Sequence, residues 1–148
     1  MKTKLPDHFR EIQVKFSRFY AHVLNKADIS ISQYALLNQL TNSKEMPMTE
    51  VGEKLHITKP AVTHLVDRLE KFKLLKRVEH PTDRRVFLIK ISPKGRRVTR
   101  QIQSDVLKIV SKALNQFKAN EQKIIVEYQK SISNVIDCVL DPSNKKQK

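Results

Sequence analysis

The 148-residue sequence has little glycine and little cysteine. Its two glycines allow few sharp turns, which disfavours a β-rich fold and a glycine-rich phosphate loop. Its single cysteine, Cys138, excludes an intrachain disulfide and suits a reducing compartment. No apolar run approaches the roughly 18 residues of a membrane span, and the first 25 residues are charged throughout, unlike a signal peptide. We therefore expect a cytoplasmic protein without a membrane partner.

Sequence motifs of catalysis and metal binding are also missing. There is no G-x-S-x-G and no H-E-x-x-H pattern, and the acidic residues fall mostly on polar helix faces. The histidines do not lie three or four residues apart, and no cysteine is near them. We therefore expect no enzyme activity, no metal site and no cofactor. The histidines are His8, His22, His56, His64 and His80.

Positive charge is the dominant feature of the composition. The formal net charge is +14, and the segment from Ser43 to Arg100 holds 15 basic and 7 acidic residues. A field of this sign attracts polyanions: DNA, RNA or an acidic membrane face. The excess is concentrated in the middle of the chain, so the polyanion is expected to bind there.

Two helices are predicted before this segment. Apolar residues recur at helical spacing over Pro6–Lys26, and Ser30 with Gln33 has the form of a capping box that opens a second helix. Two short helices follow, one capped by Thr49 and one capped by Thr58, with a tight turn at His56 and Ile57. This order predicts a helix-turn-helix.

The second of these short helices has two different faces. Pro60 fits only in its first turn, where the missing N–H costs nothing. The predicted buried face holds Ala61, Val62, Leu65, Val66, Leu69 and Phe72. The predicted free face holds Lys59, Pro60, Thr63, His64, Asp67 and Arg68.

A β-hairpin is predicted directly after this helix. Residues 75–79 and 86–91 are short runs of β-forming residues, and residues 80–85 form a polar turn with Arg84 and Arg85 at its tip. A solvent-exposed polar helix face, taken alone, usually has no binding function. Followed by a hairpin with an arginine tip, it indicates a DNA-reading head, because guanidinium groups enter narrow A·T minor grooves.

The rest of the chain is predicted to be helical. Ser92 and Pro93 open a long helix that should run to about Phe117, and Asn120 caps a last helix that ends at Asp141. The first helix and these two present long apolar stripes that a single small domain cannot bury. We therefore expect two chains to bury these stripes against each other in a dimer.

Order, spacing and residues resemble the MarR (multiple antibiotic resistance regulator) family of winged helix-turn-helix transcription regulators. The resemblance covers about Phe9–Val139. Its most specific parts are Val62–Lys71, Leu74–Arg77, Pro81–Val86 and Ile91–Gly95. One departure is Lys73, which stands where the family usually has a glycine suited to a left-handed helix end. Lys73 must adopt that conformation, or the helix must end differently.

The resemblance implies roles for individual residues. The helix face would enter the major groove, Arg85 would reach the minor groove, Asp83 would hold the wing's shape, and Arg77 would brace the wing base or contact phosphate. Phe16, Tyr20 and Tyr34 would either line the pocket of a small aromatic effector or be core residues without such a role, and the core role is the more common one. The DNA-binding set is Thr58, Lys59, Pro60, Thr63, His64, Arg68, Arg77, Asp83, Arg84 and Arg85. The dimerisation set is Phe9, Ile12, Phe16, Val110, Phe117, Tyr128, Ile132 and Val135.

We therefore expect a mainly α protein with a β-hairpin wing and helical dimerisation arms, in one domain over residues 1–148. Residues 6–42 would form the N-terminal helices, 43–91 the winged helix-turn-helix, 92–141 the C-terminal dimerisation helices and 142–148 a disordered basic tail. The expected function is a homodimeric regulator, in the first place a repressor, that binds a pseudo-palindromic operator in double-stranded DNA.

Two alternatives stay open. A non-specific nucleoid or RNA-binding protein would also carry this charge. A redox-responsive regulator would use Cys138, although Asp137 and Asp141 do not supply the positive charge that a reactive thiolate needs.

Overall fold

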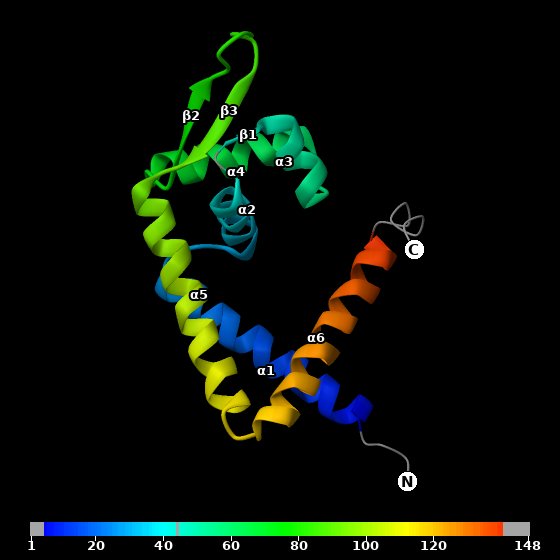
Figure 1. Cartoon of the computed structure of the whole chain (residues 1–148). Coiled ribbons are helices and arrows are strands. Elements are labelled where there is room, and N and C mark those ends of the chain that lie inside the picture. The colour runs from blue at the N-terminus through cyan, green and yellow to red at the C-terminus, as the bar shows by residue number, and fades with distance from the viewer. Residues whose placement is uncertain (1–4, 44, 141–148) are drawn as a thin grey trace. The chain divides into compact units, whose positions relative to one another are not determined.

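The computed structural model describes residues 5–43 and 45–140. Among these residues, six helices and a three-stranded antiparallel sheet confirm the mainly α class with a small wing (Figure 1). The elements are α1 Leu5–Lys26, α2 Ile31–Asn42, β1 Met46–Pro47, α3 Met48–Leu55, α4 Lys59–Lys71, β2 Leu75–Glu79, β3 Phe87–Ile91, α5 Pro93–Leu114 and α6 Ala119–Leu140. The predicted tail at 142–148 lies outside the described residues.

The chain divides into two compact units, residues 1–106 and residues 107–148. The first unit holds the hydrophobic core, to which α2, α3, α4 and the sheet all contribute. In α4 the buried residues Val62, Leu65, Val66 and Leu69 follow the helical repeat, as predicted. Two other residues of the predicted face are exposed instead. Ala61 lies a further 100° around the helix from Val62, and Phe72 lies beyond the last turn of α4.

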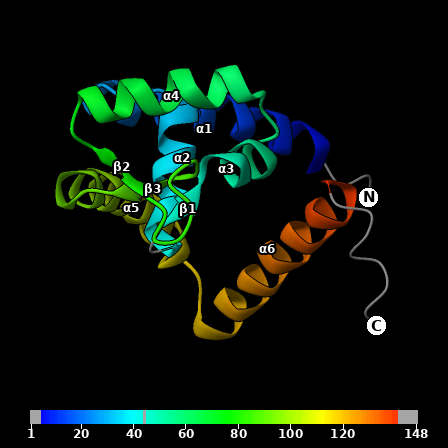
Figure 2. The ribbon, with the colours of Figure 1, turned by 90° about the horizontal axis from the view of Figure 1, so that it is seen from above.

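The sheet has the strand order β1-β3-β2, with Met46 opposite Ile89 and Leu75 opposite Ile91. β2 and β3 form the predicted hairpin, which extends beyond the helices, and α4 lies alongside it when the unit is seen from above (Figure 2). Strand β1 was not predicted, because two residues are too few to show an alternating pattern. Its Pro47 can lie there because β1 is an edge strand.

Local hydrogen bonds confirm one predicted helix start and correct two others. The backbone N–H of Gln33 donates to Ser30 Oγ at 3.2 Å and that of Ser30 to Gln33 Oε1 at 2.8 Å, which is the predicted capping box. The prediction of a Thr49 cap was wrong, because α3 already begins at Met48 with Pro47 in the cap position. The prediction of an Asn120 cap was also wrong. Helix α6 begins one residue earlier, and Glu121 accepts a hydrogen bond from the Lys118 N–H instead.

Helix α5 begins directly on the turn between α4 and β2. Ser92 Oγ accepts a hydrogen bond from the Gly95 N–H at 2.9 Å and donates one to the Lys73 carbonyl at 2.7 Å. The Ser92 N–H donates to the Leu74 carbonyl at 3.0 Å. A Cβ on Gly95 would lie 2.0 Å from that same carbonyl oxygen, so the close approach requires glycine. The helix ends at Leu114, three residues before the predicted Phe117.

The turn between α4 and β2 shows which conformation Lys73 adopts. Its φ of 59° is left-handed, so the lysine adopts the conformation that the family's glycine would take. The Lys73 N–H donates to the Glu70 carbonyl at 2.8 Å and the Leu74 N–H to the Leu69 carbonyl at 2.9 Å. These bonds close the end of α4 at a conformational cost.

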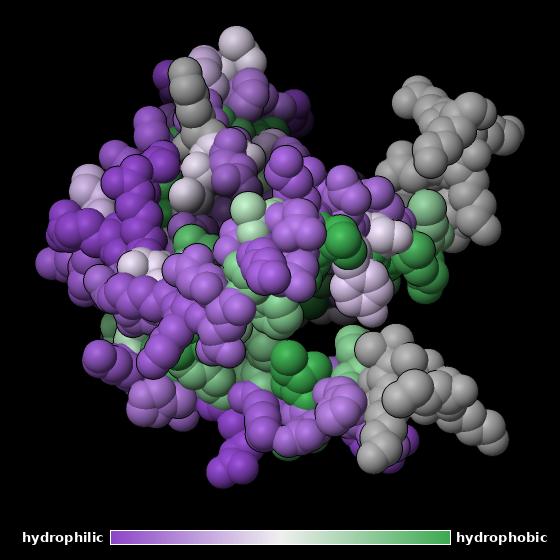
Figure 3. All heavy atoms as spheres, turned by 60° about the horizontal axis from the view of Figure 1, so that its bottom comes forward, coloured by the Kyte–Doolittle hydropathy of each residue, from purple (hydrophilic) through white to green (hydrophobic). Residues whose placement is uncertain are grey.

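Large hydrophobic side chains also remain outside the core. Figure 3 shows hydrophobic side chains open on the surface among mostly hydrophilic ones. In the described part of the second unit, α6 has no buried residue. Each unit therefore carries exposed apolar side chains outside its own core.

The substitution Lys73→Gly is expected to stabilise the protein. Glycine removes the cost of a left-handed side-chain-bearing residue, and this gain exceeds the larger entropy of the unfolded chain by about 0.5–1 kcal/mol. Urea denaturation measures it. The same substitution two residues earlier, Lys71→Gly, lies within α4 and should instead destabilise by about 1 kcal/mol. Equal losses from both variants would contradict the strain at Lys73.

Candidate nucleic-acid interface

The polar face of α4 is open to solvent along its whole length. All six residues predicted to lie on it are exposed: Lys59, Pro60, Thr63, His64, Asp67 and Arg68. The Thr63 hydroxyl donates to the Lys59 carbonyl at 3.2 Å, so its remaining capacity is to accept hydrogen bonds. The face thus offers donors, acceptors and methyl groups on one helix surface, which are the groups that read base edges.

The N-terminal end of α4 carries no side-chain cap. Thr58 occupies the predicted cap position with an extended backbone, φ −71° and ψ 157°, but its hydroxyl makes no cap hydrogen bond. No acidic residue lies in the first turn, where Lys59 adds a positive charge. Uncapped N–H groups and the helix dipole favour an anion at this end of the helix.

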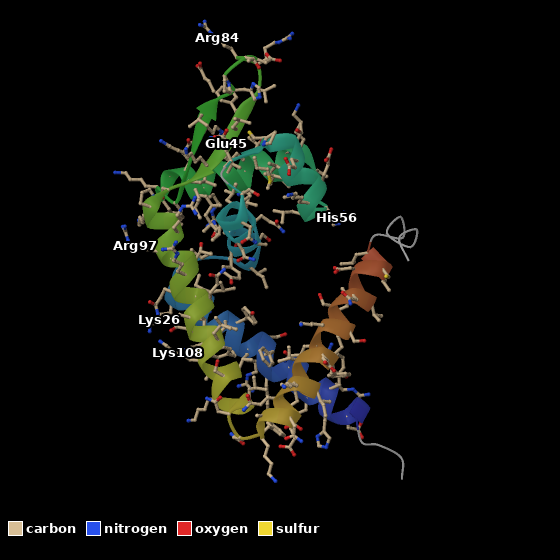
Figure 4. All side chains as sticks on the ribbon, in the orientation of Figure 1. Lys26, Glu45, His56, Arg84, Arg97 and Lys108 are labelled. Carbon is tan, nitrogen blue, oxygen red and sulfur yellow. The ribbon has the colours of Figure 1, made fainter. Side chains whose placement is uncertain are left out.

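The wing tip is organised by one carboxylate. Asp83 Oδ1 accepts hydrogen bonds from the Arg85 backbone N–H at 3.0 Å and from Arg85 Nε at 3.2 Å. The Arg85 side chain nevertheless stays 91% exposed. Arg84 stands at the very end of the hairpin, away from the helices (Figure 4). The tip therefore presents two guanidinium groups, one of them oriented by Asp83.

Arg77 connects the wing to α4. Its guanidinium binds the carboxylates of Glu70 and Asp67, with Nη2 lying 2.5 Å from Asp67 Oδ1, and its backbone N–H donates to Glu70 Oε1 at 3.0 Å. Partial burial opposes the charged guanidinium, but the hydrogen bonds to Asp67 and Glu70 outweigh that effect and raise the pKa of Arg77. Of the two roles considered for Arg77, this geometry favours the brace.

The residues predicted for dimerisation lie in both units and are considered unit by unit. In the first unit, Phe9 and Ile12 are about half exposed at 50% and 49%, and Phe16 is partly buried. In the second unit, Phe117, Tyr128 and Val135 are exposed, whereas Val110 and Ile132 are partly buried. Most of these side chains are thus available to a partner surface.

A hollow of about 610 Å³ lies between α1 and the start of α2. Phe16 and Tyr20 line it, together with Gln13, Ile29 and Ile31. Tyr34, the third predicted effector residue, packs against the core instead. Its burial, and the nearby Tyr20, raise the pKa of the Tyr34 hydroxyl. The structure thus brings two of the three predicted residues to one apolar hollow.

Residues 29–87, from the start of α2 to the wing, match the family model described as "MarR family". Over these residues the chain belongs to the MarR family.

Relatives of known name agree with this assignment. The chain is 27% identical over 109 residues to the HTH-type transcriptional regulator MhqR of Bacillus subtilis, covering 74% of this chain and 75% of MhqR. It is 27% identical over 139 residues to the uncharacterised HTH-type regulator YsmB of the same organism, covering 89% and 93%. In fold it is similar to a mutant of S. aureus MepR bound to an oligodeoxyribonucleotide, with a TM-score of 0.71, 21% identity and coverage of 88% and 97%.

This MarR-family chain is therefore a DNA-binding transcription regulator and not an enzyme. Within residues 5–43 and 45–140, no helix is long and apolar enough to cross a membrane, and no cluster of three metal-binding side chains is found. Cys138 is exposed on α6.

The hydrogen bond from the Gly95 N–H to Ser92 Oγ confirms the predicted start of α5 at Ser92. The partners of Arg77 and the bonds from Ser92 to the Lys73 and Leu74 carbonyls were not predicted. Asp67 was placed on the free face of α4, yet it pairs with an arginine ten residues away across a turn. Glu70 lies in α4 and Arg77 in β2, so the periodicity of either element carries no signal for their pairing. The only hint was the resemblance to the MarR family, which implied that Arg77 braces the wing base or contacts phosphate.

Arg77 and Glu70 are expected to be energetically coupled. Arg77→Ala should destabilise the protein by about 1–2 kcal/mol, since it leaves two partly exposed carboxylates without their partner. In a double-mutant cycle with Glu70→Ala, the second substitution should cost clearly less once the first is present. Urea denaturation of the four proteins measures this coupling. Strictly additive losses would show that the ion pair does not hold the wing to α4.

Proposed function

We propose that the protein is a homodimeric, sequence-specific repressor that binds a pseudo-palindromic operator in double-stranded DNA. The observation that carries the proposal is the pairing of one open polar helix face on α4 with an arginine-tipped hairpin that Arg77 ties to the same helix. Bound across a promoter, such a dimer would block transcription.

In this proposal α4 enters the major groove. Pro60 and Thr63 contact thymine methyl groups, Thr63 and His64 contact base edges, and Lys59 binds a guanine or a phosphate. Thr58 and Arg68, at opposite ends of the exposed face, bind the phosphates on either side. The uncapped helix start supports this orientation, since it favours an anion at the end that leads into the groove.

The wing reads the adjacent minor groove. Arg85 inserts its guanidinium, Asp83 orients Arg85, and Arg84 adds charge at the tip. Arg85 suits this role because it is almost fully exposed while its Nε is held in place by a hydrogen bond.

Dimerisation uses the apolar surface of α1, the C-terminal half of α5 and α6. The support is that α6 has no buried residue in the described chain, which leaves Tyr128, Ile132 and Val135 without an intrachain core. Two chains would then present their heads to half-sites about 10 base pairs apart.

A small aromatic effector binding at the hollow beside Phe16 and Tyr20 would act by population shift. It would favour a conformer in which the two heads no longer match the spacing of the half-sites. The hollow's apolar lining and its place on α1, one of the proposed dimer helices, support this role.

Selection of bound sites from random DNA tests the whole proposal. The recovered sequences should form an inverted repeat, and the protein should bind that operator about a thousandfold or more tightly than random DNA. A ratio near one would instead support a non-specific nucleoid or RNA-binding protein. A single unrepeated half-site would contradict the dimer.

Arg85→Ala should weaken binding to the selected operator by about 1–3 kcal/mol, because a guanidinium is lost from the minor groove. Fluorescence anisotropy with labelled operator measures the affinity. Arg10→Ala, which removes the same charge from an exposed position on α1, serves as the matched control and should change the affinity little. An unchanged affinity of a folded Arg85→Ala protein would rule out the wing's role.

A further inference from the structure

Two lysines lie directly opposite each other on the wing. Lys76 of β2 and Lys90 of β3 are paired in the register of the hairpin, and both are exposed. Side chains in such a pair have Cβ atoms about 5 Å apart, and like charges there destabilise a sheet. The hairpin therefore carries a local electrostatic cost that its fold does not require.

More positive charge gathers where the hairpin meets α5. Lys73 precedes β2, and α5 begins with Lys94, Arg96 and Arg97 and no acidic residue in its first turn. Cations are disfavoured at the N-terminal end of a helix. Lys94 Nζ donates to the Phe72 carbonyl at 3.0 Å, so the start of α5 lies against the same turn. We name Lys73, Lys76, Lys90, Lys94 and Arg97 the wing-base surface; Arg97 points outward from α5 in Figure 4.

The neighbouring carboxylates do not neutralise the wing-base surface. Asp67 and Glu70 bind Arg77, and Asp83 binds Arg85. Among the residues that the structure describes, no member of the wing-base surface forms a salt bridge with a carboxylate. Such an uncompensated cluster suits a polyanion as its partner.

The two faces of the hairpin determine which polyanion can reach it. Arg77 lies on the face that contacts α4, and successive residues of a strand point to opposite faces, so Lys76 points away from α4. If α4 occupies a major groove and the tip the next minor groove, Lys76 and Lys90 face the DNA beyond the tip. This orientation favours duplex DNA over an RNA or protein partner, since the same duplex already passes the wing.

We propose that the wing-base surface binds phosphates of the duplex flanking each half-site. The inference rests on the proposed operator binding and extends it outward from the operator. Lys90 lies five residues from Arg85, about 17 Å along an extended strand. The flanking DNA must therefore curve towards the wing, which one-sided neutralisation of its phosphates favours. The tip of the wing then binds the minor groove of the operator, and the wing-base surface binds the phosphates of the flanking duplex.

The test compares two duplexes: the selected operator alone, and the operator extended by about one helical turn, roughly ten base pairs, at each end. Wild-type protein should bind the longer duplex about tenfold more tightly at low salt. Because four lysines per dimer then contact phosphates, the plot of log binding constant against log salt concentration should be steeper by about three to four for the longer duplex. Lys76→Gln combined with Lys90→Gln should remove this gain and leave the affinity for the short operator within about twofold of wild type.

Two further double variants serve as controls for the loss of positive charge. Lys76→Arg with Lys90→Arg retains the charge and should retain the gain. Lys118→Gln with Lys123→Gln removes the same charge from exposed residues at the start of α6 and should also retain it. The Lys76/Lys90 glutamine variant should melt no lower than wild type, because it removes a repulsion.

The outcomes separate this inference from the proposed function. If the glutamine variant keeps the gain in affinity on the longer duplex, the flanking role of the two lysines is wrong. If the wild-type protein shows no such gain, the flanking role is also wrong, and RNA or an acidic protein is left as the partner. Equal weakening on both duplexes would place the lysines inside the operator and overturn the flanking role. Failure of the wild-type protein to prefer the short operator over random DNA would instead refute the proposed function.

Discussion

The contact between Gly95 and the carbonyl of Leu74 is the constraint on which the reading head depends. It joins the end of α4, the start of β2 and the start of α5 at one point, where a Cβ would lie 2.0 Å from the oxygen. The Ser92 N–H donates to the same carbonyl, and the Ser92 hydroxyl donates to the Lys73 carbonyl. Because three elements share one joint, the first turn of α5 cannot tilt without displacing both the helix and the wing.

The Arg77 ion pairs add a second restraint across the joint. They hold the inward face of the hairpin to α4, whereas the joint fixes only its base. A two-stranded hairpin alone is marginal in water, so these contacts and the buried Ile89 and Leu75 determine the angle of the wing. Left-handed Lys73 is tolerated within this arrangement because the hydrogen bonds around it over-determine its backbone.

Much of this head could be predicted from the sequence, because α4 and the hairpin have strong periodicities of 3.6 and 2, and because the Ser30 box is a local pattern. The caps predicted at Thr49 and Asn120 were wrong by two residues, because α3 begins after Pro47 without a side-chain cap and Glu121 accepts the hydrogen bond at the start of α6. The partners of Arg77 and the joint at Gly95 could not be predicted at all. Both depend on the angle of a turn, which brings together residues 7 to 21 apart in the chain.

The basic residues of the head also divide in a way that composition cannot show. Arg77 is neutralised within the protein, Arg85 is oriented by one carboxylate but remains exposed, and Lys76 and Lys90 repel each other without a counter-charge. Only charge that the fold leaves uncompensated can contribute fully to binding a polyanion, since an internal ion pair must first be broken. The joint at Gly95 ties the start of α5 to the hairpin, so Lys94 and Lys76 move as one body with α4. A change in the direction of α5 would therefore move the helix in the groove, the wing tip and the wing base together.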